Sequence, residues 1–188
     1  ISNALSFDGV DDYVTIGDFD VSPAVTVSMW VRMDQPNNGW GSLVMKRHAY
    51  GFEINGQGFN FSIGNGSAWT GTASLTLPLG QWQHVVGVFN GSSVTLYQDG
   101  VQVGSPVSAT LADNNDPLLI GSWTGSSEFF RGLIDEALIY NRALSASEVT
   151  QLYNLGSGGS TPPPSPAIYT ITVTKDGTGA GTVTSAPA

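Results

Sequence analysis

Apolar and polar residues alternate along much of this chain, which is the pattern of β-strands that bury one face. The clearest alternation is VTVSMWVRM, residues 25–33, where one face carries only valine and methionine. The other face carries Thr26, Ser28, Trp30 and Arg32. We therefore predict a strand here whose Val/Met face points into a core.

Further predicted strands follow at regular intervals. WQHVVGVFNG (82–91) and SVTLYQDGVQVG (93–104) form an expected strand pair, and the second contains an Asp99-Gly100 turn signal. LIDEALIY (133–140) is another predicted strand. Because turn signals recur roughly every ten residues, these elements predict an all-β fold, a two-sheet antiparallel sandwich.

One short helix is predicted close to residue 150. Ser145 and Glu148 have the spacing of a capping box, in which each side chain accepts a hydrogen bond from the backbone of the other residue. The helix should run from about Ala146 to Leu155, and Gly156 can end it. Its apolar side is expected to lie against the sandwich and consists of Val149, Leu152 and Tyr153.

The composition changes sharply at LGSGGSTPPPSPA, residues 155–167, where glycine and serine give way to a proline run. Such a segment is typical of a spacer between independently folded modules. We predict a β-sandwich domain over residues 1–155, a linker over 156–167 and the incomplete start of a second β module over 168–188. The first residues lack the pattern of a signal peptide, and we interpret the chain as part of a larger protein.

Composition narrows the possible functions. The formal net charge is -9, which disfavours a protein that follows nucleic-acid phosphates. The absence of cysteine excludes disulfides, thiol catalysis and cysteine-ligated zinc. No apolar run approaches the roughly 18 residues of a membrane span.

Two acidic segments are candidates for a special role. Asp8, Asp11 and Asp12 are crowded between two mostly apolar, strand-like stretches. Like charges this close repel, so these carboxylates are either solvated in a turn or neutralised by a cation. The second segment, LADNNDP, carries Asp113 and Asp116, and we interpret it as an ordinary solvated turn because Asn, Asp and Pro are turn formers.

Several motifs together resemble the laminin-G-like branch of the concanavalin A-like superfamily, over about 150 residues and in the expected order. They are ALSFDGVDDYVTI, VTVSMWVR, WQHVVGVFNGSSVTLYQDGVQVG, LLIGSW and FFRGLIDEALIYNRALSASEVTQLY. The resemblance implies a jelly roll of two curved antiparallel sheets. It leaves function open, since this fold hosts lectins, adhesion modules and glycan-cleaving enzymes. The residues after the linker resemble the start of a repeat module of bacterial surface and secreted proteins.

The resemblance also implies calcium. In relatives, the FDG and IDE strands lie side by side and often hold a calcium ion where they meet. Carried over, this places Asp8 beside Asp135, with Asp11 or Asp12 completing a shell of the hard oxygen donors that Ca²⁺ prefers. Strand alternation also puts Asp135 on an apolar face expected to point at the core, where an unpaired carboxylate is costly. In the alternative, Asp8 and Asp135 only accept backbone hydrogen bonds in turns.

The five tryptophans fall into two groups. Trp30 and Trp82 lie inside strand motifs and are expected to pack in or near the core. Trp40, Trp69 and Trp123 are flanked by Gly, Ser, Thr and Asn, so we expect them on loops. Exposed rings at one rim of the sandwich would form a platform on which a sugar stacks. In the alternative, each ring only covers one end of the core.

MKRHAYGFEI, residues 45–54, is the densest polar and aromatic stretch. Its Lys46 and Arg47 could recognise an acidic sugar or a sulfate, or Arg47 could simply pair with a surface carboxylate. Together with the loop tryptophans and the phenylalanine that follows the last of them, this stretch completes a set of candidate glycan contacts. The predicted glycan-binding residues are Trp40, Arg47, His48, Tyr50, Trp69, Trp123 and Phe129.

No catalytic pattern of the related enzymes is present. Glycosidases of this fold need two carboxylates about 5–5.5 Å apart, and the Glu-x-Asp-x-x-Glu strand is absent. Asp135 and Glu136 are adjacent and would point to opposite faces of a strand. Gln83 directly precedes His84, out of the register that alginate-lyase relatives use. We therefore predict a module without catalytic activity.

The sequence thus predicts a non-catalytic, calcium-stabilised, carbohydrate-binding module of a secreted or cell-surface bacterial protein. Its partners would be a polysaccharide and, through the linker, other domains of the same chain, and we expect a monomer. A weak sugar contact on a tether would raise the concentration of a partner domain at the polysaccharide. The alternatives are an adhesion or spacer module and, less favoured, a polysaccharide lyase or glycoside hydrolase.

Overall fold

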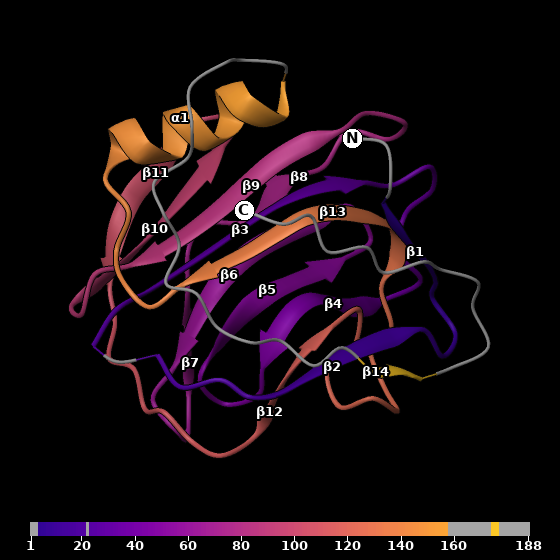
Figure 1. Ribbon diagram of the computed structural model, residues 1–188, viewed down its shortest axis with the longest axis horizontal. Helices are drawn as coiled ribbons and strands as arrows, with labels where there is room; N and C mark the ends of the chain where they lie inside the picture. The colour runs from indigo at the N-terminus through magenta and orange to yellow at the C-terminus, as the bar shows by residue number, and fades with distance from the viewer. Residues whose placement is uncertain (1–3, 22, 158–173, 177–188) are drawn as a thin grey trace.

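The structure is a computed structural model that describes residues 4–21, 23–157 and 174–176. Within these residues, two antiparallel sheets pack face to face as a jelly-roll sandwich, and one helix follows the last long strand (Figure 1). The predicted all-β jelly-roll sandwich with a short helix is confirmed.

Sheet A has the strand order β1-β13-β3-β9-β10-β11 and contains all the strands predicted from the clearest patterns. The Asp99-Gly100 turn joins β10 to β11, and both of its residues have positive φ, 50° and 78°, as a type I′ turn requires. The strand bounds are β1 Leu5–Asp8, β3 Val25–Arg32, β9 Gln83–Phe89, β10 Ser93–Gln98, β11 Val101–Ser108 and β13 Arg131–Tyr140.

Sheet B has the order β14-β2-β12-β4-β5-β6-β7, and β8 also pairs with β6. The stretch 45–54, predicted only as polar and aromatic, spans the hairpin between β4 and β5. The strand bounds are β2 Tyr13–Asp18, β4 Trp40–Lys46, β5 Tyr50–Asn55, β6 Gly58–Gly64, β7 Trp69–Gly71, β8 Leu75–Thr76, β12 Pro117–Ile120 and β14 Thr174–Asp176.

The main core lies between the two sheets. As predicted, the Val/Met face of β3 is buried there, and sheet B contributes the rings of Phe52, Phe59 and Phe61. The approach of the sheets is close enough that a side chain at Gly87 of β9 would overlap the ring of Phe61. Burying large apolar side chains of this kind is the dominant favourable contribution to folding.

Helix α1, Ala146–Gly156, starts where the sequence predicts. The Ser145 hydroxyl accepts a hydrogen bond from the Glu148 backbone N–H, and the Glu148 carboxylate accepts one from the Ser145 N–H, so the capping box is complete. The carboxylate of Glu148 also lies in the first turn, where the helix dipole favours negative charge.

Helix α1 covers the outer face of sheet A (Figure 1). Val149 and Leu152 are buried in a second apolar cluster that includes residues of β9, β10 and β13. Tyr153 stacks on Trp30 of β3, with ring centroids 5.7 Å apart. The apolar side predicted for the helix is therefore the side that packs, and sheet A has apolar contacts on both faces.

Strand β11 forms one edge of sheet A, and this edge is irregular. Its pairing with β10 shifts in register between Val94 and Leu96. The strand also contains Gly104, with φ of 71°, and Pro106, which has no backbone N–H. Most of its residues are exposed.

Strand β14, which pairs with β2, is the part of residues 158–188 that the structure describes. The rest of the predicted linker (156–167) and second module (168–188) lies outside the described residues, so those two predictions stay predictions. Among the described residues, no helix is both long and apolar enough to cross a membrane.

Candidate functional site

The outer face of sheet B is more polar than the outer face of sheet A. In β5, Phe52 and Ile54 point into the core, so Glu53 between them points outward. Asn60 of β6 is the cross-strand partner of Glu53, and its side-chain amide donates a hydrogen bond of 2.7 Å to the hydroxyl of Ser62. Polar groups therefore line a face that α1 does not cover.

Three predicted glycan contacts come together on this face. The ring of Trp69 lies 5.7 Å from that of Trp123, and the ring of His48 meets Trp123 edge-on at 6.3 Å. Trp69 begins β7 opposite Gly64, and Trp123 lies in the loop between β12 and β13. His48 is exposed, and both indoles are partly exposed. We call His48, Trp69 and Trp123 the aromatic cluster.

The other predicted aromatic contacts have different positions. Trp40, the first residue of β4, is 54% exposed and lies two residues before Ser42, so alternation places both on one strand face. Phe129 is half-buried. Tyr50 is fully buried, and its hydroxyl donates to the carbonyl of Phe19 at 3.4 Å. The prediction that Tyr50 contacts a glycan is therefore wrong, because its side chain belongs to the core.

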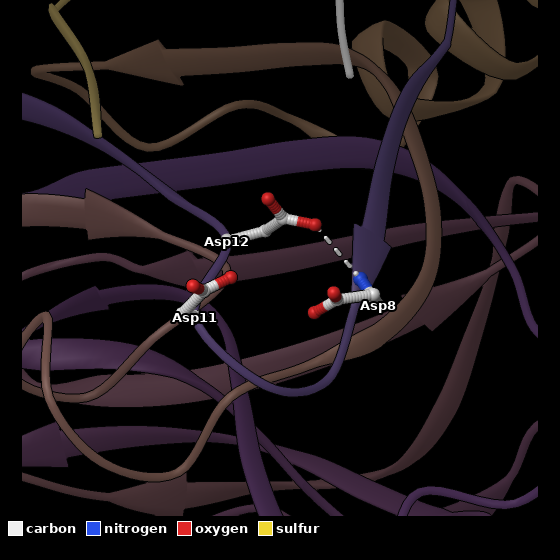
Figure 2. A group of neighbouring side chains, drawn as sticks. All are labelled: Asp8, Asp11 and Asp12. Atoms are coloured by element: carbon white, nitrogen blue, oxygen red, sulfur yellow. Dashed lines mark hydrogen bonds between the residues drawn. The ribbon is translucent and has the colours of Figure 1, made fainter. Parts of the chain in front are cut away.

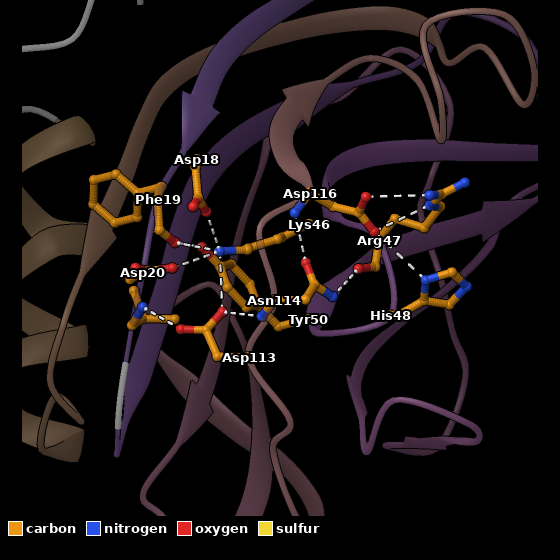
Figure 3. Close-up of polar contacts among 11 residues, drawn as sticks. Asp18, Phe19, Asp20, Lys46, Arg47, His48, Tyr50, Asp113, Asn114 and Asp116 are labelled. Atoms are coloured by element: carbon orange, nitrogen blue, oxygen red, sulfur yellow. Dashed lines mark hydrogen bonds and ion pairs between the residues drawn. The ribbon is translucent and has the colours of Figure 1, made fainter.

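Arg47 pairs with a carboxylate of the protein, which was the alternative to contact with an acidic sugar or a sulfate. Its Nε and Nη2 donate hydrogen bonds of 3.2 and 3.1 Å to Asp116 (Figure 3). The hydrogen bond from Arg47 holds the pKa of the Asp116 carboxyl below its usual value. His48 Nδ1 lies 3.5 Å from the same carboxylate. The side-chain amide of Asn114 donates a hydrogen bond of 2.8 Å to the backbone carbonyl of Arg47. These contacts attach the 113–116 loop to the aromatic cluster.

Lys46 is fully buried and is surrounded by oxygen atoms (Figure 3). Its Nζ lies 2.7 Å from Asp18, 3.1 Å from Asp20 and 3.0 Å from Asp113, and 3.3 Å from the carbonyl of Phe19. Burial alone would lower the pKa of Lys46, but the hydrogen bonds that its ammonium donates to the three carboxylates outweigh burial, and the pKa is raised. We call this arrangement the lysine cage. The interpretation of LADNNDP as an ordinary solvated turn is therefore wrong.

The predicted acidic cluster at the end of β1 is present (Figure 2). Asp8, Asp11 and Asp12 each offer a carboxylate oxygen, and these oxygens lie within 4.8 Å of one another. Asp12 is buried and accepts a 3.0 Å hydrogen bond from the Asp8 backbone N–H. Asp8 in turn accepts one of 2.7 Å from Val10. The group is both a hydrogen-bonded turn and a set of hard oxygen donors.

Asp135 lies away from this cluster. Strands β1 and β13 are antiparallel neighbours, as the resemblance implied, but the register sets Asp8 opposite Arg131. Asp135 is the partner of Trp30 in β3. Four residues of strand correspond to about 13 Å, so the prediction that Asp8 lies beside Asp135 is wrong.

A bulge explains why the face of Asp135 was also predicted wrongly. Ile134 is buried in the core between the sheets, so Asp135 points to the outer side of sheet A. The register shifts after Asp135, and Glu136 has φ of 49° with its N–H bonded to Asp135 Oδ1 at 2.8 Å. After this bulge, Ala137 and Ile139 point to the core. The carboxylate is thus a turn acceptor, as the alternative proposed.

Two carboxyl groups on the outer face of sheet B were not predicted. Burial, and then repulsion from Glu128, raise the pKa of Glu53, and burial raises the pKa of Glu128. The alternation around Glu53 indicates that it points outward. No local pattern shows that Glu128, from the loop before β13, approaches it.

Comparison with known proteins identifies the domain. A family model for laminin-G-like domains, described as the Concanavalin A-like lectin/glucanases superfamily, matches residues 8–150. The chain belongs to this superfamily. The motif-based resemblance is thereby confirmed for the domain, whereas the linker and the repeat module are not part of the match. Among curated protein sequences, none matches the chain.

Solved structures similar to this superfamily member include three relevant proteins. One is a heptameric SAP-like pentraxin from Limulus polyphemus, with a TM-score of 0.67 and 17% identity over 91% of this chain and 90% of that one. Domain 4 of the arabinanase AbnA from Geobacillus stearothermophilus, solved with arabinotriose, has a TM-score of 0.64 and 26% identity. The match covers 80% of this chain and 76% of that one. A putative carbohydrate binding protein from Bacteroides ovatus has a TM-score of 0.63 and 15% identity, covering 79% of this chain but only 46% of that one.

Proposed function

We propose that this domain is a non-catalytic carbohydrate-binding module that holds a glycan on the outer face of sheet B. The single observation that carries the proposal is the aromatic cluster, because its partly exposed rings lie together on a polar sheet face. Rings of this kind offer apolar area, while the partly exposed Asn60 side chain on the same face can hydrogen-bond to sugar hydroxyls. The similarity to an arabinanase domain solved with arabinotriose supports the choice of ligand class.

The module would act by targeting. We propose that it belongs to a secreted or cell-surface bacterial protein and that a weak sugar contact keeps neighbouring domains close to a polysaccharide. The similarity to a domain of an extracellular arabinanase supports this location. A monomer is sufficient for such a role, because other domains of the same chain provide the second contact.

The first test is binding of arabinotriose and of a glycan array to the wild type and to a Trp69→Ala/Trp123→Ala variant. We expect the double variant to bind at least about tenfold more weakly, which corresponds to about 1.4 kcal/mol. Trp82→Ala, which truncates a half-buried tryptophan beside β9 in sheet A, is the matched control and should retain binding. Equal, negligible binding by all three proteins would contradict the proposal and favour an adhesion or spacer module. Release of reducing sugar by the wild type would contradict the non-catalytic part.

We also propose that Asp8, Asp11 and Asp12 hold a structural calcium ion. Their donors are all carboxylate oxygens, which suit Ca²⁺, and these oxygens lie within 4.8 Å of one another. The similarity to a pentraxin agrees in fold. Such an ion would bind only the folded chain and would therefore stabilise it.

Calcium removal tests this site. Calcium at 100 times its dissociation constant should add about 2.7 kcal/mol to the free energy of unfolding, and a chelator should remove that gain. Asp8→Asn/Asp11→Asn should abolish the response, whereas Asp135→Asn should leave it intact because Asp135 lies on another part of sheet A. Identical melting with calcium and with chelator would leave the cluster as a hydrogen-bonded turn only.

A further inference from the structure

Glu53 and Glu128 are two carboxyl groups that the fold brings together without a counter-charge. Glu53 points outward from β5, between Ser42 of β4 and Asn60 of β6. Neither carboxyl group forms a hydrogen bond or an ion pair with another residue of ranges 4–21, 23–157 and 174–176. The charge of Glu128 nevertheless acts on Glu53 and opposes its ionisation.

The backbone fixes this approach. The Ser42 N–H donates a 3.0 Å hydrogen bond to the carbonyl of Glu128, which anchors the β12–β13 loop on β4. Ser42 is also the cross-strand partner of Glu53. Glu128 itself has φ of 53°, a left-handed conformation that a residue with a side chain adopts at an energetic cost. The β12–β13 loop therefore holds Glu128 in a strained conformation close to Glu53.

A buried hydroxyl group at the same place is also without a partner. Ser42 is fully buried, and its Oγ forms no hydrogen bond within the described part of the chain. Because Ser42 and Glu53 are direct partners across β4 and β5, their side chains share the outer face. A buried polar atom without a partner is costly, and native proteins retain such atoms mostly where a ligand, ion or water completes them.

Several other acidic groups among the described residues form ion pairs with cationic side chains of the same chain. Asp18, Asp20 and Asp113 surround Lys46, and Asp116 pairs with Arg47. The same is true of Asp34 with Arg32 and of Glu148 with Arg142. By contrast, no cationic side chain of the described residues forms an ion pair with Glu53 or Glu128.

We propose that Glu53, Glu128 and Ser42 form a divalent-cation site on the outer face of sheet B, separate from the Asp8 cluster. The donor set contains carboxylate and hydroxyl oxygens without imidazole or thiolate, which selects a hard ion such as Ca²⁺ over Zn²⁺. The ion supplies the counter-charge that the two glutamates lack. The hydroxyl oxygen of Ser42, which has no hydrogen-bond partner among the described residues, would be a further donor to the ion.

The position of this site relative to the aromatic cluster follows from the strand register. Asn60 pairs with Glu53, and Gly64, four residues further along β6, pairs with Trp69. Four residues of strand span about 13 Å on one face. Two carboxylates fill only part of the six to eight coordination positions that calcium uses, so water would occupy the remaining positions on the solvent side of the ion. The site does not depend on glycan binding for its existence.

Terbium luminescence excited through tryptophan, together with calcium titration calorimetry, tests the site. The background is the Asp8→Asn/Asp11→Asn variant, so that the other acidic cluster does not contribute. In this background we expect one equivalent of Tb³⁺ or Ca²⁺ to bind. Glu53→Gln/Glu128→Gln should weaken binding at least 20-fold, and Ser42→Ala about fivefold. Glu136→Gln, at the exposed bulge of β13, is the control and should bind as the background does.

A stability measurement distinguishes the site from mere misfolding. Without metal, Glu53→Gln should melt at a temperature equal to or above that of its parent, because it removes a repulsion and a buried charge. With millimolar calcium the order should reverse, since only the parent gains a ligand. Failure of the background variant to bind one equivalent, or binding that the glutamine variants leave unchanged, would overturn the proposal.

Discussion

Replacing Lys46 with methionine is expected to lower the free energy of unfolding by about 3 kcal/mol. The ammonium is fully buried and makes three ion pairs with carboxylates, so its removal leaves those charges facing one another. Removing one partner of a buried ion pair costs about 3–5 kcal/mol, and the partial exposure of the carboxylates keeps the loss at the lower end. Urea unfolding should show it, as should a fall in melting temperature of about 10 °C.

Arg32→Met is the matched control for this experiment. Arg32 also pairs with an aspartate, Asp34, but both side chains are exposed, and such pairs contribute about 0–1 kcal/mol. The contrast isolates burial, because both changes remove one positive charge and introduce the same side chain. A loss of the same small size in both variants would mean that the lysine cage contributes no more than a surface pair.

Stability should also fall as the pH is lowered from 6.5 to 4. His84 lies between sheet A and helix α1, with its ring 5.2 Å from that of Trp30 and its Nε2 2.9 Å from the hydroxyl of Ser28. Burial lowers the pKa of His84 from 6.5 to about 4. Between these values the unfolded chain binds a proton that the folded chain excludes, so the folded state loses stability as the pH falls. The difference corresponds to about 3 kcal/mol.

Unfolding at several pH values in the wild type and in His84→Gln measures this effect. The glutamine side chain can still bond to Ser28 but does not titrate, so the slope between pH 4 and 6.5 should flatten. The hydrogen bond from Arg142 lowers the pKa of Glu148 to about 2, so its contribution is lost mainly below this window. An unchanged slope in His84→Gln would assign the acid sensitivity to other groups.

The sequence predicted correctly those elements that depend only on residues close together in the chain. The alternation of β3, the turn at Asp99-Gly100 and the capping box at Ser145 each lie within a few residues, and each is present. The acidic cluster at Asp8 was found for the same reason, since its three members come from one turn. The Asp135 error has a local cause too, because a single bulge shifts the alternation by one position.

Contacts between distant segments were beyond such patterns. The sequence suggested Lys46, beside Arg47, as a contact for an acidic sugar, but its carboxylate partners come from the end of β2 and from the 113–116 loop. The rings of Trp69 and Trp123 meet only because β7 and the β12–β13 loop share the outer face of sheet B. Glu53 and Glu128 are brought together in the same way. Strand order, which decides all three, is a property of the whole sandwich.

The irregular edge of β11 has a consequence for molecules that gather at high density. A straight, unpaired strand edge invites a second chain to extend the sheet, which is the route to cross-β fibres. Here Pro106 lacks a donor and Gly104 kinks the backbone, so the row of edge groups is interrupted. Copies crowded together would therefore resist joining through this edge of sheet A.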